Sequence, residues 1–389
     1  MLYKKIKELC EIKKGKKVVE LEESFEDSKR YIQIDDLRNN NQVKYCSPDS
    51  NYVYVNKNDL IIAWDGANAG TVGFDLEGAI GSTLAKISVI SKNVFAPFLA
   101  LYLQSKFDYF QRTATGATIP HISRTALEDL EVPIFTMEQQ KYIFDQLMRT
   151  KKLIEKRQSQ ITALDKLTKS LFLEMFGNPI QNIKKFKQMP IKNVVSDIQT
   201  GWSPVASKEP ANNNEPGVLK LSAVTGGRYN FKENKKLLDG TPFKSEYEVN
   251  VGDVLLTRKN TKELVGACSY IFETPSQLMF SDLIFKLIIK NTTLIEPIYL
   301  WRLLNNNSMK KELSKLASGS SGSMPNISKK NLSELLVVVP PIELQKEFVD
   351  KIISLEKLRN DFIDSLSSYE KLYNSLIHKA FKGEFFQEQ

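Results

Sequence analysis

Residues 119–140 read IPHISRTALEDLEVPIFTMEQQ, and residues 324–345 read MPNISKKNLSELLVVVPPIELQ. The two stretches align without a gap at an offset of 205 residues, and eight of their 22 positions are identical, among them Ser123 and Ser328. A repeat with so long a period is not a solenoid. It indicates a tandem duplication of one domain, with the same element appended to each copy.

The similarity continues upstream of these stretches with looser spacing. Three further pairs match: CEIKKG ending at Gly15 with SDIQTG ending at Gly201, NDLIIAW from Asn58 with GDVLLTR from Gly252, and PFLALYL from Pro97 with PIYLWRL from Pro297. The duplication therefore covers about half of the chain in each copy.

A long segment without proline or internal glycine follows each copy and ends at a glycine, Gly177 or Gly383. Glycine is a common helix terminator. A 4-3 spacing runs through Ile143, Leu147, Thr150, Ile154, Arg157, Ile161, Leu164, Thr168, Leu171 and Met175, and through Phe348, Ile352, Leu355, Arg359, Phe362, Leu366, Tyr369, Tyr373, Leu376 and Ala380. This spacing predicts two helices of roughly 38 residues, about 57 Å long, that pair through a coiled-coil seam.

Two arginines occupy matching positions of this seam, Arg157 and Arg359. They either fix the register of the pair or extend their guanidinium groups to solvent, and we favour the second interpretation. Glu138 and Glu343 lie where the helices should begin.

The globular parts have an α+β pattern. Strands are expected at 31–34, 60–64 and 84–90 in the first copy and at 218–221, 254–257 and 283–289 in the second. One helix should follow near 97–112 and another near 297–316, each with proline in its first turn. The predicted order is a globular domain (1–137), a long helix (138–177), a second globular domain (178–341), a second long helix (342–383) and a tail (384–389).

Composition fits a nucleic-acid partner but does not require one. The 389 residues carry a formal net charge of +8 and a pI near 9.0. Cys10, Cys46 and Cys268 are far apart and there are only two histidines, so a disulfide framework or a metal site is not expected. Without an apolar leader or spanning segment, the chain is expected to be cytoplasmic.

Catalytic motifs are missing from the sequence. It has no G-x-x-x-x-G-K-[ST] phosphate loop, and the run Asn178-Pro179-Ile180 lacks the second proline and the aromatic residue of a methyltransferase N-P-P-Y/F motif. No His, Asp and Glu cluster has the spacing of metal ligands. We therefore expect a chain without catalytic residues of its own.

The combination of two globular domains, each closed by I-S…L…L…V-P…E-x-Q and a long helix, resembles the specificity (S) subunits of Type I restriction–modification systems. The resemblance covers the whole chain, although Leu344 stands where the family usually has Gln. It implies that each globular domain is a target recognition domain for one half of a split, asymmetric site in double-stranded DNA. It also implies an antiparallel coiled coil between the long helices, which serves as a spacer.

The partners that the resemblance implies are two modification (methyltransferase) subunits docked on the helices, and restriction (motor and nuclease) subunits. S-adenosylmethionine is then bound by the modification subunit and no cofactor by this chain. A rod of about 57 Å limits the separation of the half-sites to about 17 base pairs.

Candidate DNA contacts are polar residues in glycine-rich or basic loops, since bases are read by Arg, Asn, Gln, Ser and Thr and phosphates by Lys and Arg. In the first domain they are Lys14, Lys16, Lys17, Trp64, Asn68, Thr115, Thr118, His121 and Arg124. In the second domain they are Thr200, Trp202, Arg258, Lys259, Asn260, Lys262, Ser320, Ser323, Asn326, Lys329 and Lys330.

Several of these residues have a competing structural interpretation. Trp64 is more typical of a core aromatic side chain than of a DNA wedge, whereas Trp202 is expected to be exposed. His121 and Asn326 suit a structural cap as well as a base contact. Ser123 and Ser328 are expected to be helix N-caps.

Three functions compete. The first is the specificity subunit, either of a Type I enzyme or of an orphan methyltransferase or another phage-defence complex. The second is a free-standing sequence-specific DNA-binding regulator, which needs no partner surface on its helices. Apolar residues outside the seam, Leu153, Leu167, Phe172, Leu358 and Leu372, favour partner docking or else broaden the core. The third is an enzyme such as a nuclease.

Overall fold

The computed structural model describes residues 2–39, 42–116, 118–212, 215–318 and 324–386. The chain forms two compact units, unit 1 (residues 1–158 and 364–389) and unit 2 (residues 159–363). Each unit contains one globular segment together with portions of the two long helices, α5 (Met137–Phe176) and α10 (Ile342–Lys382).

The globular part of unit 1 consists of β1 (Leu2–Lys5), α1 (Ile6–Leu9), β2 (Cys10–Lys14), β3 (Glu20–Leu21), β4 (Lys29–Ile32), β5 (Lys44–Cys46), β6 (Val53–Val55), β7 (Leu60–Ala63), β8 (Val72–Gly73), β9 (Gly78–Ile80), β10 (Leu84–Val89), α2 (Ala96–Ser105), α3 (Phe107–Thr113), α4 (Arg124–Glu128) and β11 (Glu131–Ile134).

The globular part of unit 2 consists of β12 (Lys187–Pro190), β13 (Val195–Thr200), β14 (Gly217–Leu219), α6 (Ser222–Thr225), β15 (Asn234–Lys236), β16 (Val254–Thr257), β17 (Cys268–Tyr270), β18 (Leu278–Met279), β19 (Ile284–Ile289), α7 (Pro297–Leu304), α8 (Asn307–Leu316), β20 (Ala317–Ser318), β21 (Asn326–Ile327), α9 (Lys329–Ser333) and β22 (Leu336–Val339).

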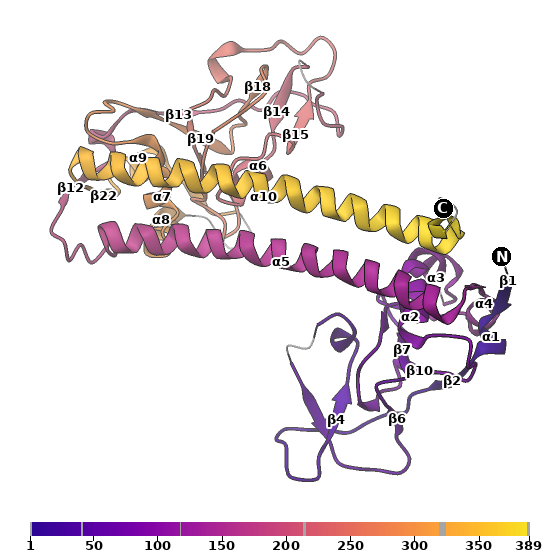
Figure 1. Ribbon diagram of the computed structural model, residues 1–389. Helices are drawn as coiled ribbons and strands as arrows, with labels where there is room; N and C mark the ends of the chain where they lie inside the picture. The colour runs from indigo at the N-terminus through magenta and orange to yellow at the C-terminus, as the bar shows by residue number, and fades with distance from the viewer. Residues whose placement is uncertain (1, 40–41, 117, 213–214, 319–323, 387–389) are drawn as a thin grey trace. The chain divides into compact units, whose positions relative to one another are not determined.

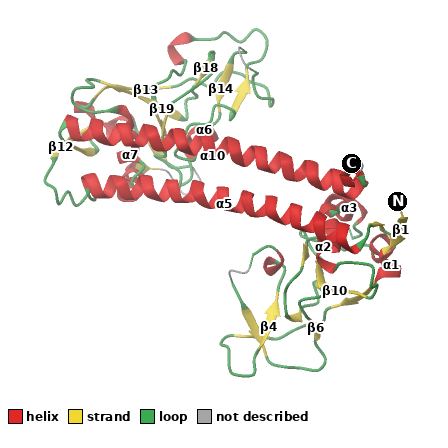
Figure 2. Cartoon of the chain, viewed as in Figure 1, coloured by secondary structure: helices red, strands yellow, loops and turns green. Residues whose placement is uncertain are grey.

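The same strand order recurs in both units, which confirms the duplication. A four-stranded sheet has the order β2-β10-β7-β8 in unit 1 and β13-β19-β16-β17 in unit 2. The first strand of each copy pairs antiparallel with the last, β1 with β11 and β12 with β22. Each copy has a second sheet, β3-β5-β4-β9-β6 in unit 1 and β15-β14-β18 in unit 2, and unit 2 also has the two-stranded sheet β20-β21 (Figure 2).

One inner strand of each four-stranded sheet, β7 in unit 1 and β16 in unit 2, is buried at every position because both of its faces are covered. In β7, Leu60 and Ile62 belong to one buried cluster, whereas Ile61 and Ala63 belong to another. Side chains of a strand alternate between its faces, so a strand buried on both sides shows a continuous apolar run. β16 repeats the pattern, which explains why LIIA and VLLT match in the sequence.

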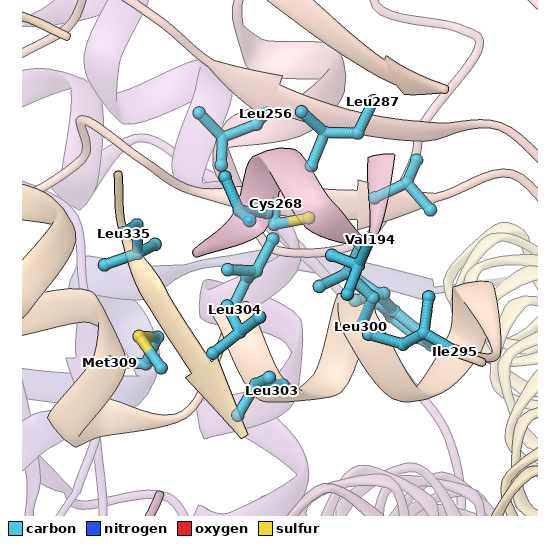
Figure 3. Packing of buried hydrophobic residues seen from close by; sticks show 14 of the residues in the cluster. Val194, Leu256, Cys268, Leu287, Ile295, Leu300, Leu303, Leu304, Met309 and Leu335 are labelled. Carbon is cyan, nitrogen blue, oxygen red and sulfur yellow. The ribbon is translucent and has the colours of Figure 1, made fainter. Parts of the chain in front are cut away.

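The main core of unit 2 lies between the four-stranded sheet and α7. Leu300, Leu303 and Leu304 of α7 pack in one cluster with Leu256 and Leu287 of the sheet (Figure 3). All five side chains are at most 2% exposed. This core fixes the ends of β13 and β16, from which the polar residues described below project.

The prediction of a single helix after the last strand of each sheet is wrong. Two helices lie there in each unit, α2 and α3 in unit 1 and α7 and α8 in unit 2. In unit 2 the break is explained by Asn306, which has an extended backbone and whose side chain accepts a hydrogen bond from the Ser308 amide. Asparagine is a strong N-cap, so it begins a new helix within the apolar pattern.

The glutamine of the repeated E-x-Q motif is a structural residue in both copies. Gln140 is buried, its Oε1 accepts from the Phe95 amide, and its Nε2 donates to the carbonyls of Asn93 and Phe135. Gln345 repeats this arrangement, with the Glu296 amide and the carbonyls of Leu294 and Pro340. Each glutamine thus satisfies backbone groups at the start of a long helix.

The two long helices pair in an antiparallel coiled coil, as predicted (Figure 1). Within unit 1, Ile143 and Leu147 of α5 cluster with Ala380 near the end of α10. Within unit 2, Phe172 and Phe176 near the end of α5 pack against Phe348 near the start of α10. Every predicted seam position in both helices is buried or half-buried, which confirms the 4-3 pattern.

The prediction that the seam arginines extend to solvent is wrong for Arg359. Its Nε donates to Oδ1 of Asp165 at 3.1 Å, so the side chain ties α10 to α5. Arg157 lies over the ring of Tyr369, 5.8 Å from its centre. The contacts join residues 194 and 212 positions apart, so the local sequence pattern did not indicate them.

Candidate nucleic-acid interface

A glycine at the end of the first sheet strand brings two backbone segments unusually close in both units. A Cβ added to Gly15 would lie 2.1 Å from the carbonyl oxygen of Gly81, and a Cβ added to Gly201 would lie 2.2 Å from that of Phe280. No other residue fits without moving the backbone. The matching glycines in CEIKKG and SDIQTG are therefore required by packing, and they place the same loop edge in both units.

Three polar side chains meet at this edge in unit 1, and we name them the first corner: Lys14, Asp65 and His121. Lys14 forms an ion pair with Asp65 (3.0 Å), and His121 Nδ1 lies 2.7 Å from Asp65 Oδ1. Because a carboxylate only accepts, Nδ1 carries the proton, and Nε2 of a neutral ring is an acceptor. The His121 side chain is 46% exposed, so it can present this atom to a ligand.

Four side chains form the second corner in unit 2: Arg258, Lys259, Asp282 and Asn326. Arg258 Nε donates to Oδ1 of Asn326 (3.1 Å), and its guanidinium lies over the ring of Phe285. The corner residues line a hollow of about 310 Å³. Arg258 is thus held in place before any ligand arrives, while Lys259 is exposed.

The two corners are the same place in the duplicated fold. Asp65 pairs with His121 in an isolated antiparallel bridge, and Lys259 pairs with Asn326 in the same way. Yet the bridge carries a carboxylate and an imidazole in unit 1, but an ammonium and an amide in unit 2. The backbone is conserved between the copies, whereas the hydrogen-bonding character of the side chains differs.

Other predicted contact residues lie exposed on loops of the two units. Those in unit 1 are Lys16, Lys17, Thr115 and Thr118, and the one in unit 2 is Lys262. Thr115 is also bridged to His121 through two backbone hydrogen bonds, so it borders the first corner. Thr200 is half-buried at the end of β13, directly before Gly201.

Some predicted contact residues have structural surroundings instead. Trp64 is 8% exposed in the core of unit 1, and Asn260 is 6% exposed and donates to the Thr225 hydroxyl. Asn68 accepts from Arg38. Trp202 is half-buried, contrary to the expectation, and Lys244 lies 4.1 Å above its ring. A buried side chain reaches a base only if the protein rearranges, so Trp64 and Asn260 are weak candidates.

The remaining predicted residues are not brought into the corners. Arg124 pairs with Glu128 on α4. Lys329 and Lys330 are exposed on α9, where they line a separate hollow with Lys192. Ser320 and Ser323 lie outside the described residues. Ser123 and Ser328 are N-caps, as predicted: their hydroxyls accept from the amides three residues later.

Sequence reasoning missed the acidic members of the corners. Asp65 holds both Lys14 and His121, and Asp282 accepts from the Ser203 hydroxyl. Carboxylates are not expected to contact DNA phosphates, so residue type alone did not indicate that they position the donors and cations. The repeat offered a signal, because Asp65 directly follows NDLIIAW just as Lys259 follows GDVLLTR.

Among the residues the structure describes, no group of three or more His, Cys, Asp or Glu side chains is arranged to hold a metal ion. No helix in the described ranges is long and apolar enough to cross a membrane. All three cysteines are free and buried, and burial raises the pKa of the Cys10 thiol to about 12.

The family of the chain follows from its sequence. Residues 2–163 and 180–367 both match the model of the Type I restriction modification DNA specificity domain. The chain belongs to this family. It is 26% identical over 365 residues to the specificity subunit of the Type I restriction enzyme MjaVIII from Methanocaldococcus jannaschii, covering 89% of this chain and 83% of that subunit.

Further relatives agree with this assignment. The specificity subunit of the EcoKI enzyme from Escherichia coli K12 is 21% identical over 360 residues, which cover 85% of this chain and 75% of that subunit. The solved S subunit of the Type I restriction–modification system from M. genitalium has a TM-score of 0.62 at 16% identity and covers 98% of this chain and 96% of that one. The family assignment makes this chain a DNA-specificity subunit.

Proposed function

We propose that each globular segment reads one half of a bipartite, asymmetric DNA site for a Type I restriction–modification enzyme. The observation that carries the proposal is the pair of corners, because one backbone arrangement presents different polar groups in the two copies. Base edges in the major groove differ in their donors and acceptors. Two readers with one scaffold and different side chains therefore suit two different half-sites.

The side chains divide into two roles in this proposal. Exposed Lys16, Lys17 and Lys262 bind phosphates and position the protein, since phosphate contacts carry no sequence information. His121 and Arg258 read bases, because each is held by a neighbour and needs little ordering on binding. Arginine most often reads guanine through its O6 and N7 atoms.

The long helices supply the spacer and the docking surface in this proposal. Leu153, Leu167, Leu358 and Leu372 lie outside the seam and are 40–50% exposed. Phe172, which the sequence placed with them, is instead buried in the core of unit 2. We propose that the four leucines contribute to contacts with two modification subunits. The restriction subunits then join this complex.

Chemistry is supplied by the partners in this proposal. The modification subunit binds S-adenosylmethionine and transfers the methyl group, while this chain binds no cofactor and selects the site. We propose that the complex works in the cytoplasm, where it meets chromosomal DNA. The same chain would serve an orphan methyltransferase equally well, because the restriction subunits do not take part in reading.

Co-expression with the modification subunit encoded beside its gene, followed by sequencing of host DNA for methylation, tests the proposal. We expect one motif with two specified blocks and a fixed gap. Arg258→Gln should alter only one block, and His121→Gln, in the other corner, only the other block. A complex that forms but methylates no motif would contradict the proposal. The proposal would also be contradicted if no complex forms and the chain alone binds a specific DNA sequence.

A further inference from the structure

A cavity of about 380 Å³ opens in unit 2 between α5, the turn after α6, and the junction of α7 with α8. Four cationic side chains line it: Lys169 of α5, Arg228 of the turn, Arg302 of α7 and Lys310 of α8. Its volume lies in the range of small-molecule sites. The cavity has no part in the recognition corners described above.

The ion pairs around this cavity leave positive charge uncompensated. Three arginines share two carboxylates: Arg228 contacts both Asp165 (2.9 Å) and Glu356 (3.0 Å), Arg302 contacts Glu356, and Arg359 contacts Asp165. Within the described part of the chain, Lys169 and Lys310 have no carboxylate at ion-pair distance. Five cations thus face two carboxylates, an excess of three positive charges.

This excess is costly because Arg302 and Lys310 are partly removed from water, although Lys169 is exposed. Burial lowers the pKa of Lys310, and the ammonium of Lys169 lowers it further. Burial also lowers the pKa of Arg302 to about 10, and Arg228 and Arg359 add to this effect against the opposing attraction of Glu356. Arg302 Nε is buried without a hydrogen-bond partner. Groups of this kind are stabilised when an anion binds beside them.

The excess charge is not inherited from the duplicated scaffold. An offset of 200 residues relates Pro97 to Pro297. At the same offset, Tyr102 and Phe110 of the first copy correspond to Arg302 and Lys310. Both are buried, and Tyr102 donates to the carbonyl of Glu131. The first copy thus has buried aromatic side chains at the positions where the second copy has two of the cations that line the cavity.

We propose that this cavity binds a phosphate-bearing ligand of up to mononucleotide size. The phosphate oxygens lie between Lys169, Lys310 and the first turn of α8, whose dipole favours an anion. Lysine binds phosphate as a point charge, and a doubly charged phosphate offsets most of the excess. Phe172 and Leu173 add an apolar wall on which the remainder of the ligand rests.

Titration calorimetry of the full chain with inorganic pyrophosphate at constant ionic strength tests the proposal. We expect saturable binding that weakens at least tenfold in Lys310→Gln. The matched control Lys166→Gln, on the exposed face of α5 outside the cavity, should change the affinity less than twofold. Thermal unfolding of each variant shows whether it is folded; Lys310→Gln removes an uncompensated cation, so its midpoint should not fall.

The source of the phosphate is distinguished by competition. If a short duplex of unrelated sequence displaces pyrophosphate, the natural ligand is the DNA backbone; if AMP displaces it and the duplex does not, the ligand is a free nucleotide. Equal affinity in wild type and Lys310→Gln, or no pyrophosphate binding, would overturn the proposal. If a glutamate-rich peptide binds, loses affinity in Lys310→Gln, and neither pyrophosphate nor AMP binds, the cavity instead accepts carboxylates of a protein partner.

Discussion

Units 1 and 2 attach a globular segment to the helix pair in different ways. In unit 1 the attachment is aromatic: Phe381 of α10 packs against Phe98 and Tyr102 of α2. Unit 2 has its own aromatic cluster around Phe348, but adds the ion pairs of Arg228 and Arg302 with Glu356. The aromatic packing between a globular segment and the helix pair is thus common to both copies, whereas the polar groups around it differ.

Loss of the apolar packing that both copies share should have the largest effect on the free energy of unfolding. Phe348 is fully buried against Phe172, Phe176 and Tyr299, so Phe348→Ala should lower the free energy of unfolding by about 3–5 kcal/mol. The matched change Ile143→Ala, 205 positions earlier, should cost about 2–5 kcal/mol. Hydrogen exchange of each variant should show lost protection in its own unit. Equal loss in both units would mean that they unfold together.

The ion pairs should give the next largest effect, and only in unit 2. Glu356 is 7% exposed and receives two guanidinium groups, so Glu356→Gln leaves Arg302 without its carboxylate and leaves Arg228 with Asp165 alone. We expect a loss of about 2–4 kcal/mol, below the full cost of a broken buried pair because Arg228 is partly solvated. Urea unfolding should show this loss shrinking as salt increases.

Lys151→Gln is the matched control for this change, 205 positions before Glu356. Lys151 lies half-buried on α5 in unit 1, and we expect its replacement to change stability by no more than about 0.5 kcal/mol. A cost for Lys151→Gln similar to that of Glu356→Gln would show that the two attachments do not differ as the structure indicates.

A smaller effect should be shared by both units. Asp59 accepts from the Asn56 amide, the Ser88 hydroxyl and Lys86. Burial alone would raise the pKa of the Asp59 carboxyl, but these hydrogen bonds outweigh it and lower the pKa below its ordinary value. Asp59→Asn should therefore cost about 1–3 kcal/mol at neutral pH.

The pH dependence of this loss follows from the sign of the shift. A carboxyl with a lowered pKa in the folded state stabilises the protein above its unfolded pKa, near 3.9, and loses that contribution as the pH falls through the folded pKa. The difference between wild type and Asp59→Asn should therefore shrink below about pH 4. At neutral pH, Asp253→Asn tests the matching hydrogen bonds in unit 2, where Asp253 meets Lys286 and the Asn250 amide. If the difference in unfolding free energy between wild type and Asp59→Asn does not change with pH, the stabilising role assigned to the Asp59 carboxylate is wrong.

Much of the fold could be predicted from the sequence because its signals are local or repeated. The 4-3 spacing from Ile143 and from Phe348 gave the helices, and the alignment of two copies gave the duplication. The break at Asn306 lies in the polar run 305–308, but it was missed because apolar residues on both sides of that run suit a helix. The contact of Arg359 with Asp165 was missed because it depends on the register of two helices far apart in the chain.

The candidate site was harder to predict than the fold. Residue type selected Arg258 and His121, which the structure places at equivalent corners, but it also selected Trp64 and Asn260, which are buried. The type of a side chain does not reveal its exposure after a strand ends. The cationic cavity was not predicted at all, since Lys169, Arg228 and Lys310 come from three separate segments.

The central claim is that each globular segment reads its own half-site. Its most direct test replaces the second globular segment, residues 178–341, with a copy of the first, residues 1–137, and determines the methylated motif after co-expression with the modification subunit. The account predicts an inverted repeat in which both blocks equal the first half-site. A motif that keeps its original second block would contradict the account, because the residues assigned to read it would be gone.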